Sequence, residues 1–590
     1  VFGFPEEALD RVSDSLDGYS ATGLETSPSL RATFGEQIDS PRWKQFLSFA
    51  AALDGFPRHL GIHNGGMVLS GPPLLDCIPI EPAAMEDRFV VQWDKDALEA
   101  AGWIKLDVLG LRMLSAIQDA CEIVAAQTGK RPDLSALRFD DPRVYAMIRR
   151  GETVGVFQVE SRAQASLIPR FKTRSFADLT IQIALIRPGP VQANMVHPYL
   201  NRRDKLEPVE YLHPRLKPAL EETLGVVLFQ EQVLRVAQSL AGFTPGEGER
   251  LRRALSHKRA GEQIESFREK FIAGARSKGV PHKIAGQVFE QLKAFGGYSF
   301  SKAHAAAFAV ITYWSAWLRC YTPPAFFAGI LRHQPMGFYE PHVVVSDAQR
   351  VGVKFLPVDL RYSQANVTVE GNAIRLGLNT VQGFGPEHIE AIEAERQRGP
   401  FASLAELVRR TDLDRRHVEA LALAGALDHL GGRRQLVWDI AEAYRLAKRP
   451  RELSLHSPDE RAELRPMSTS ERLATTFAYT GVSLEGHLTT LRRDAFTRAG
   501  ARPISELAQL KQGQRVRVGG VIVARQHPPT AKGFAFLALE DPDGIVNIVV
   551  HPDVYARCRE AIHSFFVVVD GVVQKDRGAI HVVAGEISAI

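Results

Sequence analysis

The last 80 residues alternate between apolar and polar side chains with a period of two, and this pattern restricts the possible folds more than any other part of the sequence. Such alternation predicts β-strands with one buried face. The turn sequence Asp541-Pro542-Asp543-Gly544 interrupts the strands, and a helical pattern follows from Val554 to Ile562. Three strands, a helix and two strands in this order predict an OB-type barrel.

The remainder of the chain has a mostly helical pattern. Apolar residues with helical spacing fill residues 1 to about 58 and dominate residues 151 to 331. Short β-like runs, separated by proline and glycine, lie between these two segments. Two helical units follow from about 376 to 432, and a charged, proline-containing stretch from Lys448 to Arg472 predicts a linker. The sequence therefore predicts a multidomain α+β protein.

Composition narrows the class of protein. A length of 590 residues suggests roughly four domains of about 150 residues each. The longest apolar runs, such as Phe565 to Val569, are far shorter than the roughly 20 residues of a membrane helix. The four cysteines form no Cys-x-x-Cys pair, and a net charge of +4 does not by itself indicate nucleic-acid binding. These features predict a cytoplasmic protein that does not enter a membrane.

The segment from Trp103 to Leu111 carries the first chemical pattern. In a strand here, Lys105 and Asp107 lie next to each other on one face, because side chains alternate between the two faces. The opposite face is apolar and is predicted to be buried, with the following helix holding the strand rigidly. A carboxylate beside an ammonium group suits a divalent metal and a phosphate, although an ordinary surface ion pair has the same pattern.

This segment resembles the Lys-x-Asp-x-Leu-Gly-Leu strand of the bacterial DNA polymerase III alpha family, the C-family polymerases. The resemblance continues through further motifs in the same order. These are Gly155-Val156-Phe157-Gln158-Val159-Glu160-Ser161-Arg162, Ala184-Leu185-Ile186-Arg187-Pro188-Gly189-Pro190, Phe229-Gln230-Glu231-Gln232-Val233, Leu251-Arg252-Arg253-Ala254 and Tyr298-Ser299-Phe300-Ser301-Lys302-Ala303-His304.

The resemblance implies a domain order that covers the whole chain. It predicts a helical thumb at 1–58, the C-terminal part of a polymerase-beta-like palm at 59–115, helical fingers at 116–370, a tandem helix-hairpin-helix DNA-binding region at 371–435, a linker at 436–510 and an OB-fold barrel at 511–590.

The resemblance also implies two Mg²⁺ ions, which three aspartates of the family hold for nucleotidyl transfer from deoxynucleoside triphosphates. Asp107 matches the third aspartate. The first two belong to an upstream strand, so this chain alone is expected to be inactive. Two Asp-x-Asp pairs within the chain have the right spacing, but they match noncatalytic segments and are not expected to bind metal. They are Asp94-Lys95-Asp96 and Asp412-Leu413-Asp414.

Triphosphate binding requires cations, and the planar guanidinium of arginine donates paired hydrogen bonds to phosphate. Arg252 and Arg253 match the family's triphosphate-contacting pair, and Lys302 and His304 match a segment near the nucleotide. The resemblance also implies that Lys105 lies beside Asp107 near the phosphates of the nucleotide. Arg187, in an Arg-Pro-Gly-Pro turn, is the remaining candidate for this role. Without the resemblance, these groups would be interpreted as solvated helix faces or caps.

Three residue pairs outside these motifs complete the prediction. His59 and His63 flank a short apolar run and are interpreted as a structural pair, because no nearby helical glutamate completes a metal site. Gly65 and Gly66 are expected to allow close approach of the backbone. Gly383 and Gly385 surround Phe384 in a predicted helix-hairpin-helix turn, whose amides can face a DNA phosphate.

The predicted barrel suits a single-stranded template. Charge would come from Arg515, Arg517 and Arg525, and base stacking from Phe534 and Phe536. Primer-template DNA is therefore the predicted partner.

Three features resemble the error-prone accessory branch of the family rather than its replicative branch. The chain ends soon after the barrel, the linker contains no clamp-binding peptide, and two phrases, Leu60 to Gly66 and His333 to Tyr339, are similar to that branch. This resemblance implies translesion synthesis after DNA damage and recruitment to the sliding clamp through an inactive polymerase-like partner. The alternatives are a replicative alpha subunit and a noncatalytic DNA-binding scaffold.

Overall fold

The computed structural model of the protein describes residues 2–14, 28–54, 56, 61–83, 85, 87–186, 196–256, 261–296, 300–448, 463–528, 531 and 533–590. It divides into two compact units, which we call the N-terminal unit (1–111) and the C-terminal unit (112–590) and describe separately. Within the described residues, no helix is both long and apolar enough to cross a membrane.

The N-terminal unit begins with the predicted helices. Trp43 and Leu47 of the third helix are buried together with Val12, Leu30 and Ile38, so three short helices close over one small apolar core. Pro41 occupies the first turn of that helix, where its missing N–H costs nothing. The helices are α1 (Glu6–Asp14), α2 (Pro28–Phe34), the 3₁₀ turn η2 (Gly35–Asp39) and α3 (Pro41–Ala52).

The predicted strands of the N-terminal unit form two antiparallel ladders. Strand β1 (Gly66–Leu69) pairs with β4 (Ile104–Asp107), and β2 (Ile80–Pro82) pairs with β3 (Phe89–Val91). The 3₁₀ turn η3 (Leu74–Asp76) lies between β1 and β2, and helix α4 (Lys95–Ala100) precedes β4.

One expectation about β4 is wrong. Its apolar face is exposed, with Ile104 at 65%, Leu106 at 44% and Val108 at 59% of their full accessibility. The helix expected to hold this strand, α5 (Arg112–Thr128), belongs to the C-terminal unit, where it packs against α17 (Pro323–Arg332). The reason is that β1 and β4 form a ladder of only two strands, and no described element of the N-terminal unit covers that face.

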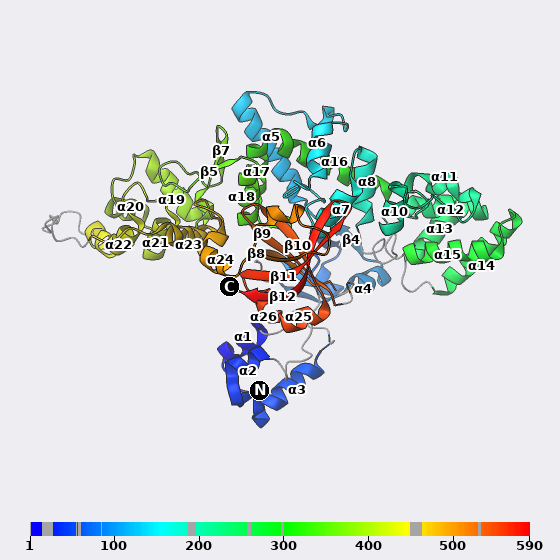
Figure 1. Ribbon diagram of the computed structural model, residues 1–590, viewed down its shortest axis with the longest axis horizontal. Coiled ribbons are helices and arrows are strands. Elements are labelled where there is room, and N and C mark those ends of the chain that lie inside the picture. Colours follow the sequence, from blue (N-terminus) through cyan, green and yellow to red (C-terminus); the bar gives the residue numbers. More distant parts are fainter. Residues whose placement is uncertain are drawn as a thin grey trace. The chain divides into compact units, whose positions relative to one another are not determined.

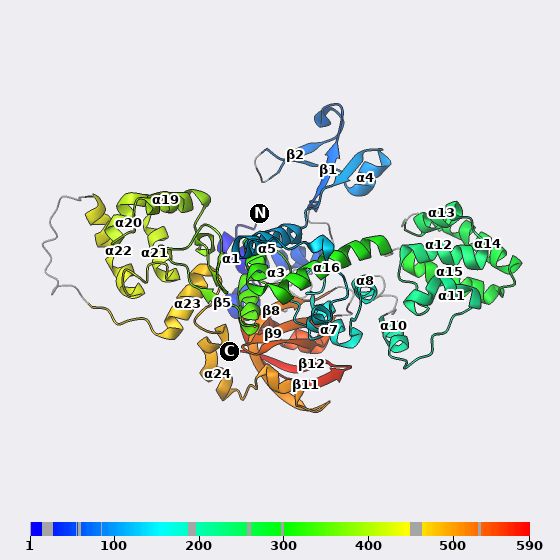
Figure 2. The same cartoon turned by 90° about the horizontal axis from the view of Figure 1, so that it is seen from above.

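Helices dominate the first half of the C-terminal unit, as predicted. Its apolar cores include one around α5, α16 and α17, one among α11 to α15, and one to which α7, α8 and α10 contribute. Figure 2 shows α11 to α15 packed together as one group. Besides α5 and α17, the elements are η4 (Leu134–Ala136), α6 (Pro142–Arg149), α7 (Arg162–Phe171), α8 (Phe176–Leu185), α10 (Val196–Arg203), η5 (Pro214–Leu216), α11 (Lys217–Leu220), η6 (Glu221–Thr223), α12 (Gln230–Ala241), α13 (Pro245–Ser256), α14 (Gly261–Ser277), α15 (His282–Gly296), α16 (Lys302–Tyr321) and α18 (Pro341–Arg350).

A small sheet and a second helical group follow. Strands β5 (Lys354–Leu356), β7 (Ala373–Arg375) and β6 (Thr368–Glu370) form a sheet in that order. The helical group contains η7 (Leu378–Thr380), α19 (Pro386–Gln397), α20 (Leu404–Thr411), α21 (Arg415–Ala424) and α22 (Arg433–Lys448).

The prediction of a linker over 436–510 is wrong for most of the residues that the structure describes in this range. Helix α22 extends through the start of this range, and further helices occupy its second half, because apolar residues such as Leu436, Leu473 and Leu488 are buried there. These later elements are α23 (Thr469–Thr480), η9 (Leu488–Arg492), α24 (Arg493–Arg498) and η10 (Ile504–Ala508).

The C-terminal strands close into a barrel in the order β10-β12-β11-β8-β9, an arrangement consistent with the OB fold (Figure 1). Alternate residues such as Val516, Val518, Leu537 and Leu539 point inward, as the period of two predicts. The predicted order is confirmed by β8 (Arg515–Gln526), β9 (Ala535–Asp541), β10 (Gly544–Val550), α25 (Pro552–Arg557), α26 (Arg559–His563), β11 (Phe566–Asp576) and β12 (Ala579–Ala589).

Candidate active site

Asp107 ends strand β4 and lies on the same face as Lys105. The register pairs Asp107 with Gly66 and Lys105 with Val68 of β1. The Asp107 carboxylate is half exposed, and its Oδ1 accepts a hydrogen bond of 3.2 Å from the backbone N–H of Leu109. This bond fixes one oxygen and leaves the carboxylate facing solvent, as a metal ligand requires.

His63 is a neighbour of Asp107 that the sequence did not reveal as part of this site. Its Nε2 lies 3.5 Å from Asp107 Oδ2, while its Nδ1 accepts a hydrogen bond of 3.1 Å from Gly65 N. Gly65 allows the expected close approach of the backbone, since a Cβ there would lie 2.6 Å from the Leu109 backbone. A Cβ at Gly66 would instead meet the side chains of Lys105, at 2.7 Å, and His63, at 3.0 Å. His59 lies outside the described residues.

Mg²⁺ requires about six oxygen ligands, of which carboxylates supply the charge. Among the residues that the structure describes, no group of three histidine, cysteine, aspartate or glutamate side chains is placed to hold a metal. Asp107 can therefore supply only part of a site for two Mg²⁺ ions. The two Asp-x-Asp alternatives have structural roles, because Asp94 caps α4 by accepting from Ala97 N and Asp414 caps α21 by accepting from His417 N.

In the C-terminal unit, the starts of α12 and α16 lie side by side. Gln230 N donates to Phe300 O over 2.9 Å, and the Glu231 carboxylate accepts from both Ser301 Oγ and Lys302 N, at 3.1 and 3.0 Å. Two helix N-termini therefore meet at one place. The first N–H groups of each helix have no partner within their own helix, and the Glu231 carboxylate accepts from one of them.

Arg252 and Lys302 both reach this meeting point. Arg252, on α13, donates to Gln230 Oε1 over 3.4 Å, and Lys302 lies in the first turn of α16 with its Nζ 2.6 Å from a Glu222 oxygen. The Arg253 side chain, next along the same helix, is 70% exposed. The structure thus brings together candidate cations that are 50 residues apart in sequence.

His304 lies two residues further along α16 than Lys302. Its ring packs between those of Phe300 and Phe308, with centroid distances of 5.1 and 4.2 Å, and the residue remains exposed. Aromatic neighbours on two sides hold the imidazole in place at the edge of the cluster. Arg187, the remaining triphosphate candidate, lies outside the described residues.

The turn before α19 has the backbone that its glycines predict. Gly383 adopts φ +86°, in the left-handed region, whereas Gly385 is extended and precedes the helix. Gln382 N donates to Tyr479 O over 2.8 Å, and Gly385 N donates to the His388 ring over 3.3 Å. A DNA phosphate at this turn would therefore compete with bonds inside the protein for two of its amides.

The barrel candidates lie at two separate places. Arg515 and Arg517 begin β8, where Arg517 pairs with Asp570 at 3.0 Å. Phe536 lies opposite Gln526 at the other end of β8, roughly 30 Å along the strand. Phe534, close by, packs against His551 with ring centroids 4.6 Å apart. Arg515 and Arg517 therefore do not form one compact patch with the aromatic rings, whereas Arg525 lies at the same end of β8 as Phe536.

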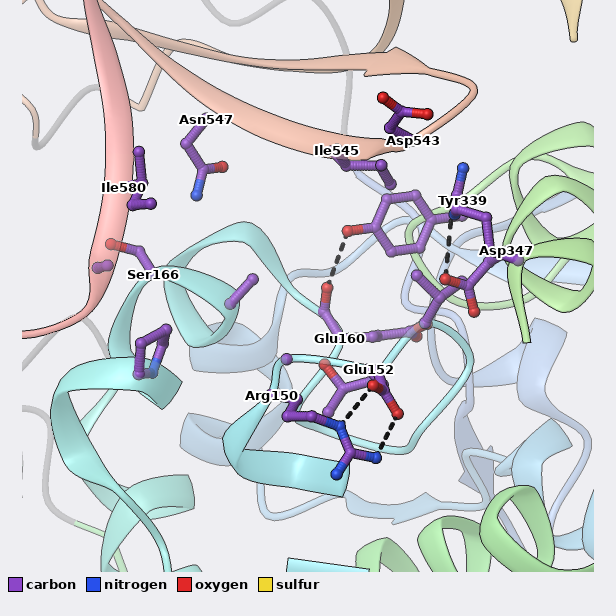
Figure 3. A pocket seen from close by; sticks show the side chains of 18 of the residues that line it. Arg150, Glu152, Glu160, Ser166, Tyr339, Asp347, Asp543, Ile545, Asn547 and Ile580 are labelled. Carbon is purple, nitrogen blue, oxygen red and sulfur yellow. Dashed lines mark hydrogen bonds and ion pairs between the residues drawn. The ribbon is translucent and has the colours of Figure 1, made fainter. Parts of the chain in front are cut away.

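A pocket of about 420 Å³ lies between the helical core and the barrel. Glu160, Tyr339 and Asp347 line it from the helical side, and Asp543 and Asn547 from the barrel (Figure 3). Burial raises the pKa of Glu160 to about 7, while N–H groups of Gly155 and Phe338 oppose the shift. None of the predicted site residues lines this pocket.

Comparisons with known families match most of the chain in order. The bacterial DNA polymerase III alpha NTPase domain matches residues 1–110, the finger domain of the same subunit matches 113–279, and a helix-hairpin-helix motif matches 352–437. The boundary between the first two matches falls where the two compact units separate.

Error-prone DNA polymerases are similar over almost the whole chain. That of Methylococcus capsulatus is 40% identical over 621 residues, covering 100% of this chain and 58% of its own. That of Anaeromyxobacter dehalogenans is 42% identical over 598 residues, covering 97% and 52%, and that of Corynebacterium glutamicum is 42% identical over 547 residues, covering 92% and 51%. The chain spans about half the length of these relatives. It belongs to the bacterial DNA polymerase III alpha-like family, as a homologue of the error-prone DNA polymerases.

Proposed function

We propose that the full-length protein is a template-directed DNA polymerase that performs error-prone, damage-induced translesion synthesis. The observation that carries this proposal is the cluster at the starts of α12 and α16, around which Arg252, Lys302 and His304 lie. Basic side chains grouped near helix N-termini are suited to a triphosphate. Homology to error-prone polymerases across the whole chain supports the same assignment.

In this proposal, 1–58 is the thumb, 59–115 the palm segment, 116–370 the fingers, 371–435 the duplex-binding helix-hairpin-helix region and 511–590 a barrel for single-stranded template. Asp107 is one of the carboxylates for two Mg²⁺ ions, and Lys105 screens phosphate charge beside it. When bound, the ions lower the pKa of the primer 3′-oxygen and neutralise the leaving pyrophosphate. The residues of this chain bind and orient the triphosphate.

Primer extension by the full-length protein tests the proposal. With Mg²⁺ and four deoxynucleoside triphosphates, D107N should lose at least about 100-fold in rate, because a metal ligand contributes several kcal/mol to the transition state. D96N is the matched control, since Asp96 is an exposed aspartate in the same unit. Normal extension by D107N would remove Asp107 from the site. An inert full-length protein that still binds primer-template would instead favour the noncatalytic scaffold.

The subtype and partners need separate tests. Insertion opposite an abasic template position, compared with a normal base, should be retained by an error-prone polymerase and lost by a replicative alpha subunit. Capture of the full-length protein on immobilised sliding clamp should require an inactive polymerase-like partner. Direct capture without that partner would contradict the proposed route of recruitment.

A further inference from the structure

Arg252 and Arg253 are consecutive residues of α13, yet both contact the same carboxylate. Glu249 Oε2 accepts from Arg252 Nε at 2.8 Å, and Glu249 Oε1 accepts from Arg252 Nη2 at 2.8 Å and from Arg253 Nε at 2.9 Å. Consecutive side chains on an α-helix point about 100° apart, so they diverge unless something draws them together. Glu249 is three residues before one arginine and four before the other, the two spacings that face both.

The geometry of these bonds shows whether Glu249 orients the two guanidinium groups or occupies the nitrogens that a phosphate would contact. Glu249 contacts Arg253 through Nε, the guanidinium nitrogen nearest the backbone, and 70% of the Arg253 side chain stays exposed. Arg252 is also held from a second side by Gln230, whose neighbour Glu231 binds the start of α16. Glu249 therefore connects both guanidinium groups to the same cluster while one of them still faces solvent.

The charge balance supports the same role. The hydrogen bonds from Arg252, and then from Arg253, lower the pKa of Glu249 to about 2, so this carboxylate stays ionised at neutral pH. One negative charge between two guanidinium groups reduces their mutual repulsion, which otherwise increases as they approach. The three groups together keep a net charge of +1, which still attracts a triphosphate.

We propose that Glu249 is a positioning residue that holds Arg252 and Arg253 side by side for the triphosphate of the incoming nucleotide. The proposal rests on the proposed function, because it assumes that the two arginines bind phosphate. Glu249 itself does not contact the substrate and acts only through the arginines. A carboxylate that instead competed with phosphate would have the opposite effect on affinity.

The test uses the full-length protein and two measurements. Binding of sodium tripolyphosphate by calorimetry reports the phosphate site without catalysis, and single-nucleotide insertion gives KM and kcat. E249Q should weaken tripolyphosphate binding about tenfold and raise KM by a similar factor, because hydrogen bonds between charged groups are lost. The kcat and the affinity for primer-template should change less than twofold. E249D, which keeps the charge on a shorter side chain, should recover part of the loss.

E265Q is the matched control. Glu265 of α14 pairs with Arg268 at 3.0 Å with the same three-residue spacing, outside the cluster, and its loss should leave both measurements unchanged. Unchanged or tighter tripolyphosphate binding by E249Q would overturn the proposal. R252A separates this failure from failure of the proposed function, because unchanged binding by R252A would show that the arginines do not bind phosphate at all.

Discussion

Arg350 of α18 donates a hydrogen bond of 3.0 Å to Glu540 of β9, although the two residues are 190 positions apart in sequence. Glu540 is fully buried in the barrel wall. The contact continues into the helical core, because Arg350 and Arg319 both pair with Asp347, at 3.6 and 2.6 Å. A line of alternating charges, buried except at the partly exposed Arg350, therefore joins α16, which begins at the proposed triphosphate site, to the barrel.

Loss of Arg350 should loosen the barrel. R350M leaves the Glu540 carboxylate buried without its arginine partner, while His487 Nε2 lies 3.7 Å from the other carboxylate oxygen. Removal of one partner of a buried pair costs about 3–5 kcal/mol. Hydrogen exchange of the β8 and β9 amides should therefore become faster in R350M. The double variant R350M/E540Q should recover most of the protection, because the side chain at position 540 then carries no buried charge. Protection lost additively in the double variant would contradict this coupling.

Glu160 should make stability depend on pH. Its pKa is raised to about 7 in the folded protein, above the ordinary value of 4.5, by burial. The folded state therefore binds the proton more tightly, so this contribution is fully present below about pH 4.5 and is lost as pH rises to about 7. The expected loss is about 3 kcal/mol.

Thermal unfolding of the wild type and E160Q between pH 5 and 8 measures this contribution. E160Q cannot ionise, so its Tm relative to the wild type should rise from pH 5 to about pH 7 and then level off. Parallel curves would mean that Glu160 does not change its protonation state there. E152Q is a suitable control, because Glu152 also lines the pocket but forms a partly exposed pair with Arg150.

The two glycines of the turn before α19 should respond differently to alanine. G383A forces a side chain into φ +86°, which costs roughly 1–2 kcal/mol and distorts the turn. G385A keeps an extended backbone and meets only the flexible Glu387 side chain. Duplex DNA binding at low salt should therefore weaken in G383A and remain near normal in G385A. Equal loss in both variants would indicate that DNA binding requires glycine at both positions because it lacks a side chain, and that the left-handed backbone of Gly383 is not the cause.

The sequence predicted those features that depend on local periodicity. Alternation along β8 to β12 was enough for the barrel, since one closed sheet buries the inward side chains by itself. The same alternation failed at β4, because periodicity shows that a face is apolar and not what covers it. Ile104 and Leu106 are exposed, because no described element of the N-terminal unit covers their face of the ladder.

The sequence could not predict every residue of the candidate site, because some residues enter it through contacts that sequence spacing does not show. His63 reaches Asp107 only through the pairing of Gly66 with Asp107, and that register is set by the fold. Glu249 was overlooked because it resembles any acidic residue one turn before an arginine. The prolines and charges near Arg472 suggested a linker, whereas the buried Leu473 places a helix there.

Arg525 and Arg515 should have separable roles in the barrel. The Arg525 guanidinium donates to the carbonyls of Ile562, His563 and Ser564, at 2.6 to 3.1 Å, and so closes the end of α26. R525M should therefore lower the Tm of the barrel and leave the salt dependence of single-stranded DNA binding unchanged. R515M removes an exposed charge. If Arg515 contacts phosphate, R515M should reduce the slope of log affinity against log salt by about 0.7 with little change in Tm. A slope reduced only by R525M would reverse the two assignments.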